Sequence, residues 1–235
     1  KPLVRIGDKP ILWHIMKTFD VQGFSEFILT LGYKGEMIKE YFLNYQSLTH
    51  DLVLNTKTGN SEMISVHEKE DWNITMVNTG VENLKGSRIK QVEKYCDNEI
   101  NIIAYGDTLS DVNINKVIEF HLTHGKIATL TGVRPPSRWG QLTLENNQVT
   151  QFQEKPQSSE GIINGGFIVF NQELFNFLAE DPKCDFEIGP LNEIANIGEL
   201  MCYPYDGFHI CMDAKRDQEN IELLWNSNHA PWKIW

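Results

Sequence analysis

Cysteine is scarce in this chain of 235 residues, with four copies that lie far apart. No two of them form a C-x-x-C pair, so the sequence disfavours a disulfide framework and a zinc knuckle. Isolated thiols are typical of proteins in a reducing compartment, and no signal-peptide pattern is visible. We therefore expect a cytoplasmic protein.

Long apolar runs and an excess of positive charge are also absent. The longest apolar runs fall far short of the roughly 20 residues that a membrane helix needs. The formal net charge is −11, whereas a protein that binds a phosphate backbone needs a basic stripe. These features argue against a membrane protein and against a nucleic-acid-binding protein. They leave room for a small nucleotide ligand, because such a ligand requires only a few local cations.

The first half of the sequence alternates helical and strand patterns. Apolar spacing predicts helices at Pro10–Phe19, Glu36–Tyr45, Arg88–Tyr95 and Ile114–His121, and strands at Phe27–Leu31, Leu52–Leu54, Ile74–Val77, Ile100–Tyr105 and Ala128–Val133. This rhythm is typical of βαβ units and predicts an open, mostly parallel α/β sheet flanked by helices. The polar stretch between Leu54 and Ile74 is expected to contain a surface hairpin.

The rhythm changes after Gly132. Residues 140–156 have the alternating pattern of a hairpin that turns at Asn146 and Asn147. Further patterns predict strands at Phe167–Phe170 and Met201–Tyr203 and helices at Leu174–Leu178, Leu191–Ile197 and Asp217–Trp225. No internal repeat or low-complexity linker divides the chain. We therefore expect residues 1–235 to form one compact domain.

The segment Y-G-D-T-L-S-D, residues 105–111, places an aspartate directly after a glycine at the end of an expected strand. Ligands of open α/β sheets lie beyond the carboxyl ends of the strands, and Gly106 would let the backbone approach one closely. Asp107 then either caps the following helix or holds a positive charge such as a metal ion. Asp111 lies nearer the start of that helix and is the better candidate cap.

The segment M-D-A-K-R-D, residues 212–217, has the same arrangement, because Asp213 follows a patterned stretch and precedes a helix. Two carboxylates from separate strand ends would form an oxygen site suited to Mg²⁺, which binds substrate phosphates. Each aspartate taken alone is also a common helix cap. His121 and His124 are spaced i, i+3, but no third ligand is evident nearby, so a metal site there is disfavoured.

Two further segments have both a plain and a functional interpretation. In Q-E-K-P, residues 153–156, Glu154 and Lys155 form either a solvated surface pair or contacts to sugar hydroxyls and a phosphate. In N-G-G-F, residues 164–167, the two glycines fit a β-bulge as well as the close approach of a ligand. The residues alone leave both alternatives open.

Together and in this order, the segments resemble the sugar-1-phosphate nucleotidyltransferases, and within them the glucose-1-phosphate cytidylyltransferase branch. The matching motifs are K-P-I-L-W-H-I-M-K (9–17), G-Y-K-G-E-M-I-K-E-Y-F (32–42), W-N-I-T-M-V-N-T-G (72–80), Y-G-D (105–107), E-K-P (154–156), I-N-G-G-F (163–167), M-D (212–213) and A-P-W-K-I-W (230–235). The first and last of these are the more particular to the branch. The resemblance implies a Rossmann-like fold of the nucleotide-diphospho-sugar transferase type, with a small β-hairpin and helical region that binds the sugar.

The resemblance also implies a role for each matched residue. Asp107 and Asp213 match the two Mg²⁺ ligands, and Lys1 matches a catalytic lysine that contacts the nucleotide phosphates. The nucleotide site would further contain Arg88 and Gly106, and the sugar-phosphate site Gly140, Glu154, Lys155 and Gly166. The family's glycine-rich loop, which cradles the triphosphate, would lie N-terminal to Lys1 and outside this chain.

The implied reaction transfers a cytidylyl group from CTP to a phosphorylated acceptor, α-D-glucose 1-phosphate, and releases pyrophosphate. It needs no covalent nucleophile, because positioning and neutralisation of charge by Mg²⁺, Lys1, Arg88 and Lys155 would suffice. The run K-G-S-R at 85–88 stands where the family usually has Thr-Gly-Gly-Arg, so a different phosphorylated acceptor is an alternative. A non-catalytic, ligand-sensing homologue is another alternative, and a homo-oligomer is expected.

Overall fold

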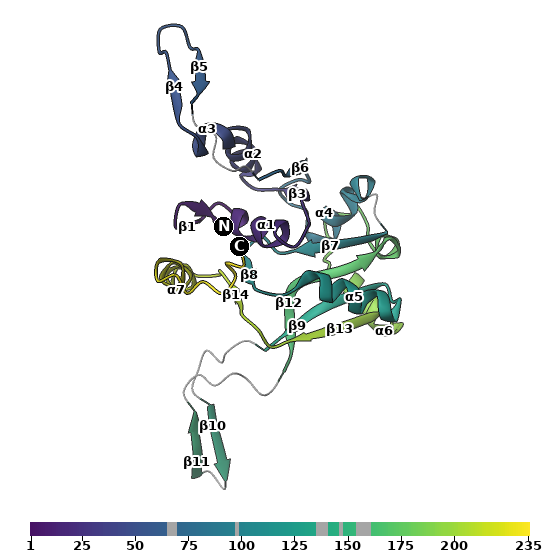
Figure 1. Cartoon of the computed structure of the whole chain (residues 1–235). Helices are drawn as coiled ribbons and strands as arrows, with labels where there is room; N and C mark the ends of the chain where they lie inside the picture. The colour runs from purple at the N-terminus through teal and green to yellow at the C-terminus, as the bar shows by residue number, and fades with distance from the viewer. Residues whose placement is uncertain (65–69, 97–98, 135–140, 146–147, 154–160) are drawn as a thin grey trace.

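The computed structural model describes residues 1–64, 70–96, 99–134, 141–145, 148–153 and 161–235 (Figure 1). The helices are α1 (Ile11–Asp20), α2 (Gly35–Leu43), α3 (Tyr45–Thr49), α4 (Lys85–Gln91), α5 (Ile114–His124), α6 (Pro190–Asn196) and α7 (Lys215–Asn226), with the 3-10 helices η1 (Glu93–Tyr95) and η2 (Gln172–Phe177). The strands are β1 (Arg5–Ile6), β2 (Lys9–Pro10), β3 (Glu26–Leu31), β4 (Leu52–Leu54), β5 (Ser61–Met63), β6 (Asn73–Asn78), β7 (Ile100–Ala104), β8 (Thr108–Ser110), β9 (Ala128–Val133), β10 (Gln141–Glu145), β11 (Gln148–Gln153), β12 (Ile163–Asn171), β13 (Leu200–Tyr205) and β14 (His209–Cys211).

The central sheet has the strand order β13-β9-β12-β7. β13 runs parallel to β9, whereas β12 runs antiparallel to both β9 and β7. Three of these strands therefore point the same way, and β12 is the reversed one. The parallel pair β3–β6 continues the βαβ pattern at the N-terminal side. The expected open, mostly parallel mixed sheet is thus confirmed.

The bulge interpretation of N-G-G-F is also confirmed. The register between β12 and β9 shifts between Asn164 and Ile168, and Gly166 has a φ of 79°. A side chain at Gly166 would be strained by that φ and would lie 3.2 Å from the ring of Tyr105. This bulge packs β12 against the end of β7, where Tyr105 begins the Y-G-D turn.

Two local expectations differ from the structure, and one strand pairing was not expected. The segment expected as a helix at Leu174–Leu178 is the 3-10 helix η2, Gln172–Phe177. The helix expected at Arg88–Tyr95 begins earlier, at Lys85, and is split into α4 and η1 around Val92. The antiparallel ladder between β8 and β14, which joins Thr108 to Cys211, was not expected at all.

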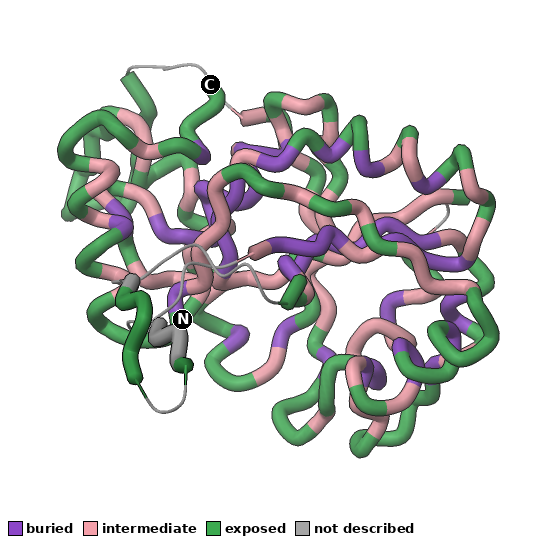
Figure 2. Tube along the Cα trace, turned by 90° about the horizontal axis from the view of Figure 1, so that it is seen from below, coloured by how far each residue is buried: buried purple, intermediate pink, exposed green. Residues whose placement is uncertain are grey.

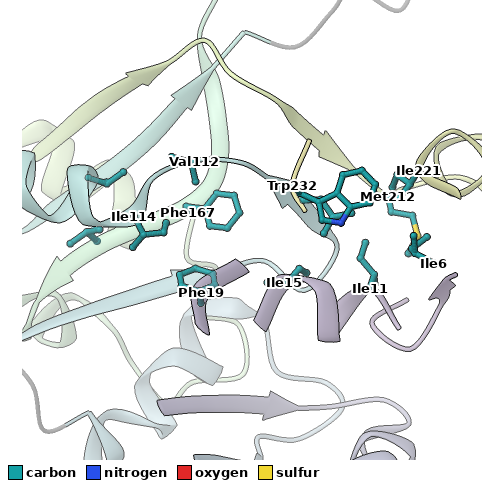
Figure 3. Close-up of a cluster of buried hydrophobic side chains, with 13 residues drawn as sticks. Ile6, Ile11, Ile15, Phe19, Val112, Ile114, Phe167, Met212, Ile221 and Trp232 are labelled. Carbon is teal, nitrogen blue, oxygen red and sulfur yellow. The ribbon is translucent and has the colours of Figure 1, made fainter. Parts of the chain in front are cut away.

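Two apolar clusters form the interior. The first gathers α1, α7 and the strands around β8 (Figure 3) and contains Ile6, Ile11, Ile15, Phe19, Leu109, Val112, Ile114, Val117, Phe167, Val169, Met212, Ile221 and Trp232. The second, named here the η2 cluster, contains Ile127, Ala128, Ile168, Phe170, Leu174, Phe175, Leu178, Phe186, Leu191 and Ile194. Figure 2 shows the buried stretches running through the centre of the chain, with exposed residues around them.

The two motifs most particular to the branch lie in the first cluster. His14 is fully buried; its Nε2 lies 2.9 Å from the carbonyl oxygen of Ile6, and its Nδ1 accepts from Trp232 Nε1 at 3.5 Å. The rings of Trp13 and Trp235 are 5.7 Å apart at their centroids and meet edge to face. Residues 9–17 and 230–235 therefore join the two ends of the chain by packing.

Two hairpins extend from the body of the molecule in Figure 1, β4–β5 at the top and β10–β11 at the bottom. The first is the surface hairpin expected after Leu54, and it leaves Leu52, Val53 and Leu54 exposed. The second is the hairpin expected within residues 140–156, whose turn at Asn146 and Asn147 lies outside the described residues. Among the helices that the structure describes, none has the length and apolar character needed to cross a membrane.

Candidate functional site

Asp107 and Asp213 are brought together by the β8–β14 ladder. Asp107 lies in the turn between β7 and β8, and its carbonyl oxygen accepts the N–H of Met212 at 2.8 Å. Since Cys211 pairs with Thr108, the residue that follows β14 lies beside the one that precedes β8. The two strand ends expected to share a site therefore do meet.

Lys1 lies between the two carboxylates. Its Nζ is 2.9 Å from Asp213 Oδ1 and 3.5 Å from Asp107 Oδ2. The hydrogen bond with Asp213 is the main cause that raises the pKa of Lys1, against a smaller opposing effect of burial. The ammonium therefore stays charged and offsets part of the repulsion between the carboxylates.

Neither aspartate caps a helix. The N-cap of α5 is Asn113, whose side chain accepts the N–H of Lys116 at 3.1 Å. At the start of α7, the carboxylate of Asp217 accepts the N–H groups of Ala214 and Asp213 at 2.8 and 3.1 Å. The capping alternative for Asp107 and Asp213 is therefore wrong.

The expectation that Asp111 caps α5 is also wrong. The Asp111 carboxylate accepts the N–H of Phe208 at 2.8 Å and the hydroxyl of Tyr205. Asp111 thus holds the segment that leads into β14, which is a structural duty that Asp107 does not share. The two aspartates of Y-G-D-T-L-S-D, Asp107 and Asp111, therefore have different contacts.

The cluster has the composition and spacing of a cation site. The ligand atoms of Asp107, Cys211 and Asp213 all lie within 4.8 Å of one another. Two oxygens that share one Mg²⁺ at about 2.1 Å each stand no more than about 4.2 Å apart, which is close to this spacing. The two carboxylates fit a hard divalent cation. Cys211 was not expected here, and burial, followed by Asp107, raises the pKa of its thiol to about 11.

Gly106 leaves open space beside this cluster. A Cβ built on Gly106 would meet only Pro2, at an ordinary contact distance of 3.6 Å from its Cγ. The packing of the described chain therefore does not require glycine at this position. A ligand that approaches the backbone next to Asp107 would give glycine a reason to be there.

Arg88 lies on α4, and its guanidinium donates hydrogen bonds to the loop at residues 79–83 that precedes this helix. Nη1 donates to Thr79 Oγ1 at 2.9 Å, Nε to the carbonyl oxygen of Asn83 at 2.8 Å, and Nη2 to that of Val81 at 3.2 Å. A Cβ on Gly32 would lie 2.5 Å from the guanidinium, so glycine at that position makes room for it. In this structure Arg88 shapes the loop at residues 79–83.

The expected sugar-phosphate residues are described only in part. Gly166 forms the β12 bulge, whereas Gly140, Glu154 and Lys155 lie outside the described residues. Next to Gly166, the Tyr105 hydroxyl donates to Glu187 Oε1 at 2.6 Å and lies 3.4 Å from Asn164 Nδ2. Sequence reasoning missed Glu187, because it lies in an irregular segment with no pattern that marks it.

The histidine pair on α5 has a structural partner. His121 Nδ1 and His124 Nε2 lie 2.9 and 2.8 Å from the hydroxyl of the buried Thr129. Among the described residues, the group with the spacing of a metal site is the one at Asp107, Cys211 and Asp213.

Known proteins resemble the chain over its full length. It is 43% identical over 235 residues to a protein of Bacillus subtilis (strain 168) named probable glucose-1-phosphate cytidylyltransferase, and 44% identical over 238 residues to the glucose-1-phosphate cytidylyltransferase of Salmonella typhi. Both matches cover 100% of this chain and 91% of the relative.

Solved structures show the same fold. HddC from Yersinia pseudotuberculosis superposes with a TM-score of 0.65 at 21% identity, and the match covers 94% of this chain and 88% of that one. A protein of Bacillus anthracis named putative glucose-1-phosphate thymidylyltransferase gives the same TM-score over 96% of this chain and 86% of that one at 14% identity. The model of the family described as "Nucleotidyl transferase" matches residues 1–196. The chain therefore belongs to the nucleotidyl transferase family.

Proposed function

We propose that the protein transfers a cytidylyl group from CTP to α-D-glucose 1-phosphate, giving CDP-glucose and pyrophosphate. The convergence of Lys1, Asp107 and Asp213 from three separate segments carries this proposal. It is supported by the two relatives at 43% and 44% identity that are named for this activity. Residues 1–235 would act as one nucleotidyltransferase domain, and the cytoplasmic location and homo-oligomer expected from the sequence belong to the same proposal.

The reaction is an in-line displacement at the α-phosphorus of CTP. A phosphate oxygen of the acceptor forms the new P–O bond, and the bond from the α-phosphorus to the bridging oxygen breaks. Pyrophosphate leaves with that electron pair. No protein nucleophile is required, because the chain contributes position and charge.

The cation would be held by Asp107 and Asp213, whose spacing and oxygen donors fit Mg²⁺. When bound, Mg²⁺ supplies neutralisation of phosphate charge. Lys1 would hold the nucleotide phosphates, since its ammonium lies beside both carboxylates and its side chain is about half exposed, at 48%. Gly106 would admit the nucleotide close to the backbone, and Arg88 would set the shape of the loop that faces it.

The acceptor would be held by residues of the second half of the chain. Glu154 would bind sugar hydroxyls and Lys155 the acceptor phosphate, with Gly140 and Gly166 lining the pocket. For Gly166, the support is its place in the β12 bulge against Tyr105, two residues before Asp107. An acceptor bound there would lie near the metal end of the site.

Pyrophosphate release by the full-length protein in Mg²⁺ tests the proposal. CTP, UTP, dTTP and GTP are each offered with glucose 1-phosphate, and with mannose 1-phosphate as a second acceptor. We expect kcat/KM to be at least about tenfold higher with CTP, because groups that accept from the amino group of cytosine are left unpaired against uracil.

Each outcome of this assay is informative. Comparable release from UTP or dTTP would reject the cytidylyl assignment and keep the nucleotidyl transfer. Release with mannose 1-phosphate but not with glucose 1-phosphate would make mannose 1-phosphate the acceptor in place of glucose 1-phosphate. Nucleotide binding without release from any pair would favour the non-catalytic, ligand-sensing homologue.

A further inference from the structure

The carboxylate of Glu187 joins separate segments beside the candidate site. Glu187 lies between η2 and α6, where the Asp185 side chain accepts the N–H groups of Glu187 and Ile188 at 3.0 and 3.1 Å. The preceding Phe186 is fully buried in the η2 cluster. Because the backbone is held on both sides, the Glu187 carboxylate points in a defined direction.

That carboxylate has two partners. It accepts the Tyr105 hydroxyl at 2.6 Å and forms an ion pair with Lys85, the first residue of α4. The ammonium of Lys85 also lies 4.5 Å from the centroid of the Tyr105 ring. The three side chains therefore contact one another, although they come from three distant parts of the chain.

Tyr105 connects this cluster to the metal end. Its N–H donates to the carbonyl oxygen of Gly166 at 3.1 Å, and it lies two residues before Asp107. Its hydroxyl donates to Glu187 Oε1, so Tyr105 is bonded through both its backbone and its side chain. Contacts that fix the Tyr105 ring and hydroxyl therefore also restrain the turn at residues 105–107.

We propose that Glu187 is a positioning residue for the transfer reaction, one that acts through Tyr105 on the turn that presents Asp107. This inference rests on the proposed function. A displacement of about 1 Å at reacting groups costs roughly a hundredfold in rate, so loss of the hold lowers kcat. Arg88 keeps its own bonds to the loop at residues 79–83, so KM for CTP changes by less than about threefold.

The test compares variants in the pyrophosphate-release assay with CTP and glucose 1-phosphate. Glu187→Ala and Tyr105→Phe each lower kcat about 10- to 100-fold. The double variant loses no more than the worse single one, because both changes remove the same hydrogen bond. Glu187→Gln retains most of kcat, since its amide oxygen still accepts the phenol proton. Glu193→Gln, at an exposed position of α6, is the matched control and leaves kcat unchanged.

Several results would overturn the inference. Losses that multiply in the double variant, or a Glu187→Gln variant as impaired as Glu187→Ala, exclude a role through Tyr105. A lowered Tm with unchanged kcat in Glu187→Ala would mean that Glu187 has a structural role only. A rise in KM for CTP as large as the fall in kcat would mean that Glu187 acts on nucleotide binding. An inactive wild-type protein overturns the proposed function itself, whereas an active one with unaffected variants overturns this inference alone.

Discussion

The two described cations of the candidate site differ in what they contact. Lys1 meets the carboxylates of Asp107 and Asp213, which come from other segments, and its side chain is about half exposed. Arg88 meets oxygen atoms of the loop that immediately precedes it, at Thr79, Val81 and Asn83. The first cation is placed by tertiary contacts with groups of opposite charge. The second is placed by local hydrogen bonds with groups that carry no charge.

This difference separates a cation that a ligand can take over from one that shapes the chain. Exposed ion pairs contribute only about 0–1 kcal/mol, so Lys1 can leave its carboxylates at small cost. Hydrogen bonds from a charged donor contribute about 1.5–3 kcal/mol, and Arg88 makes several. The family resemblance implies a site role for both residues, and their contacts in the structure differ in kind.

The largest expected effect is at the carboxylates that Lys1 contacts. Asp107→Asn should lower kcat/KM about 10²- to 10⁴-fold, because stabilisation of phosphate charge by a bound cation is worth several kcal/mol. Asp111→Asn is the matched control, since Asp111 holds Phe208 and Tyr205 instead. It should lower Tm and leave kcat/KM within about threefold, as a structural residue does. Equal activity losses in the two variants would remove the distinction between the two aspartates.

The proximity of Asp107 and Asp213 could be predicted from sequence, whereas the ladder that produces it could not. Both aspartates follow apolar or patterned stretches, and strand ends of an open sheet gather at one edge. β8 is only Thr108–Ser110, three residues with polar ends, and its partner β14 lies about a hundred positions later in the chain. Short strands whose pairing is set by distant residues carry little local signal.

The contacts of Arg88 and Glu187 could not be predicted from the sequence either. The loop bonds of Arg88 depend on the backbone path of residues 79–83, and no spacing rule predicts a carbonyl that points back at a guanidinium. Glu187 meets Tyr105 because Asp185 and the burial of Phe186 fix an irregular turn. The sequence predicted the longer helices α1, α2, α5 and α7 and most of the longer strands well, because apolar periodicity is local. The roles of Gly140, Glu154 and Lys155 stay predictions.

The second largest expected effect is a loss of folding stability at acid pH, and it arises at His121. Burial, together with the charge of His124, lowers the pKa of His121 to about 4, and its side chain is buried beside Thr129. The folded pKa lies below the unfolded value of about 6.5, so folding favours the neutral ring. The stabilisation is complete above about pH 6.5 and is lost as pH falls toward 4.

Urea unfolding measures this loss. Between pH 7.5 and pH 4.5, the free energy of unfolding should fall by about 2–3 kcal/mol more in the wild type than in His121→Asn. The variant keeps a polar group near Thr129 and removes the titrating ring. An identical pH dependence in both proteins would assign the acid sensitivity to other groups, such as the buried His14, whose pKa burial also lowers.

The third effect concerns the scaffold role of Arg88. Arg88→Lys should reduce the free energy of unfolding by about 1–3 kcal/mol, because an ammonium cannot reproduce the planar set of donors that reaches three oxygens. KM for CTP should rise in the same variant as the loop loosens. Arg216→Lys, at an exposed position of α7, is the control and should change neither quantity. A rise in KM without any loss of stability would make Arg88 a direct nucleotide contact and weaken the contrast with Lys1.

The smallest effect is at Lys1, and it has the opposite sign. The Lys1 ammonium lies at 2.9 and 3.5 Å from the carboxylates that would hold a divalent cation, so it competes with that cation. Removing it by Lys1→Ala should tighten Mn²⁺ binding in the absence of nucleotide about two- to fivefold, which corresponds to an exposed ion pair of up to about 1 kcal/mol. The signal of free Mn²⁺ in electron paramagnetic resonance measures this directly. Lys9→Ala is the control, because Lys9 lies over the rings of Trp13 and Tyr45.

With CTP present the order of the Mn²⁺ affinities should reverse, since Lys1 then contacts phosphate and favours binding of the nucleotide and metal together. Unchanged Mn²⁺ affinity in Lys1→Ala, while Asp107→Asn abolishes binding, would show that Lys1 and the cation do not exclude each other.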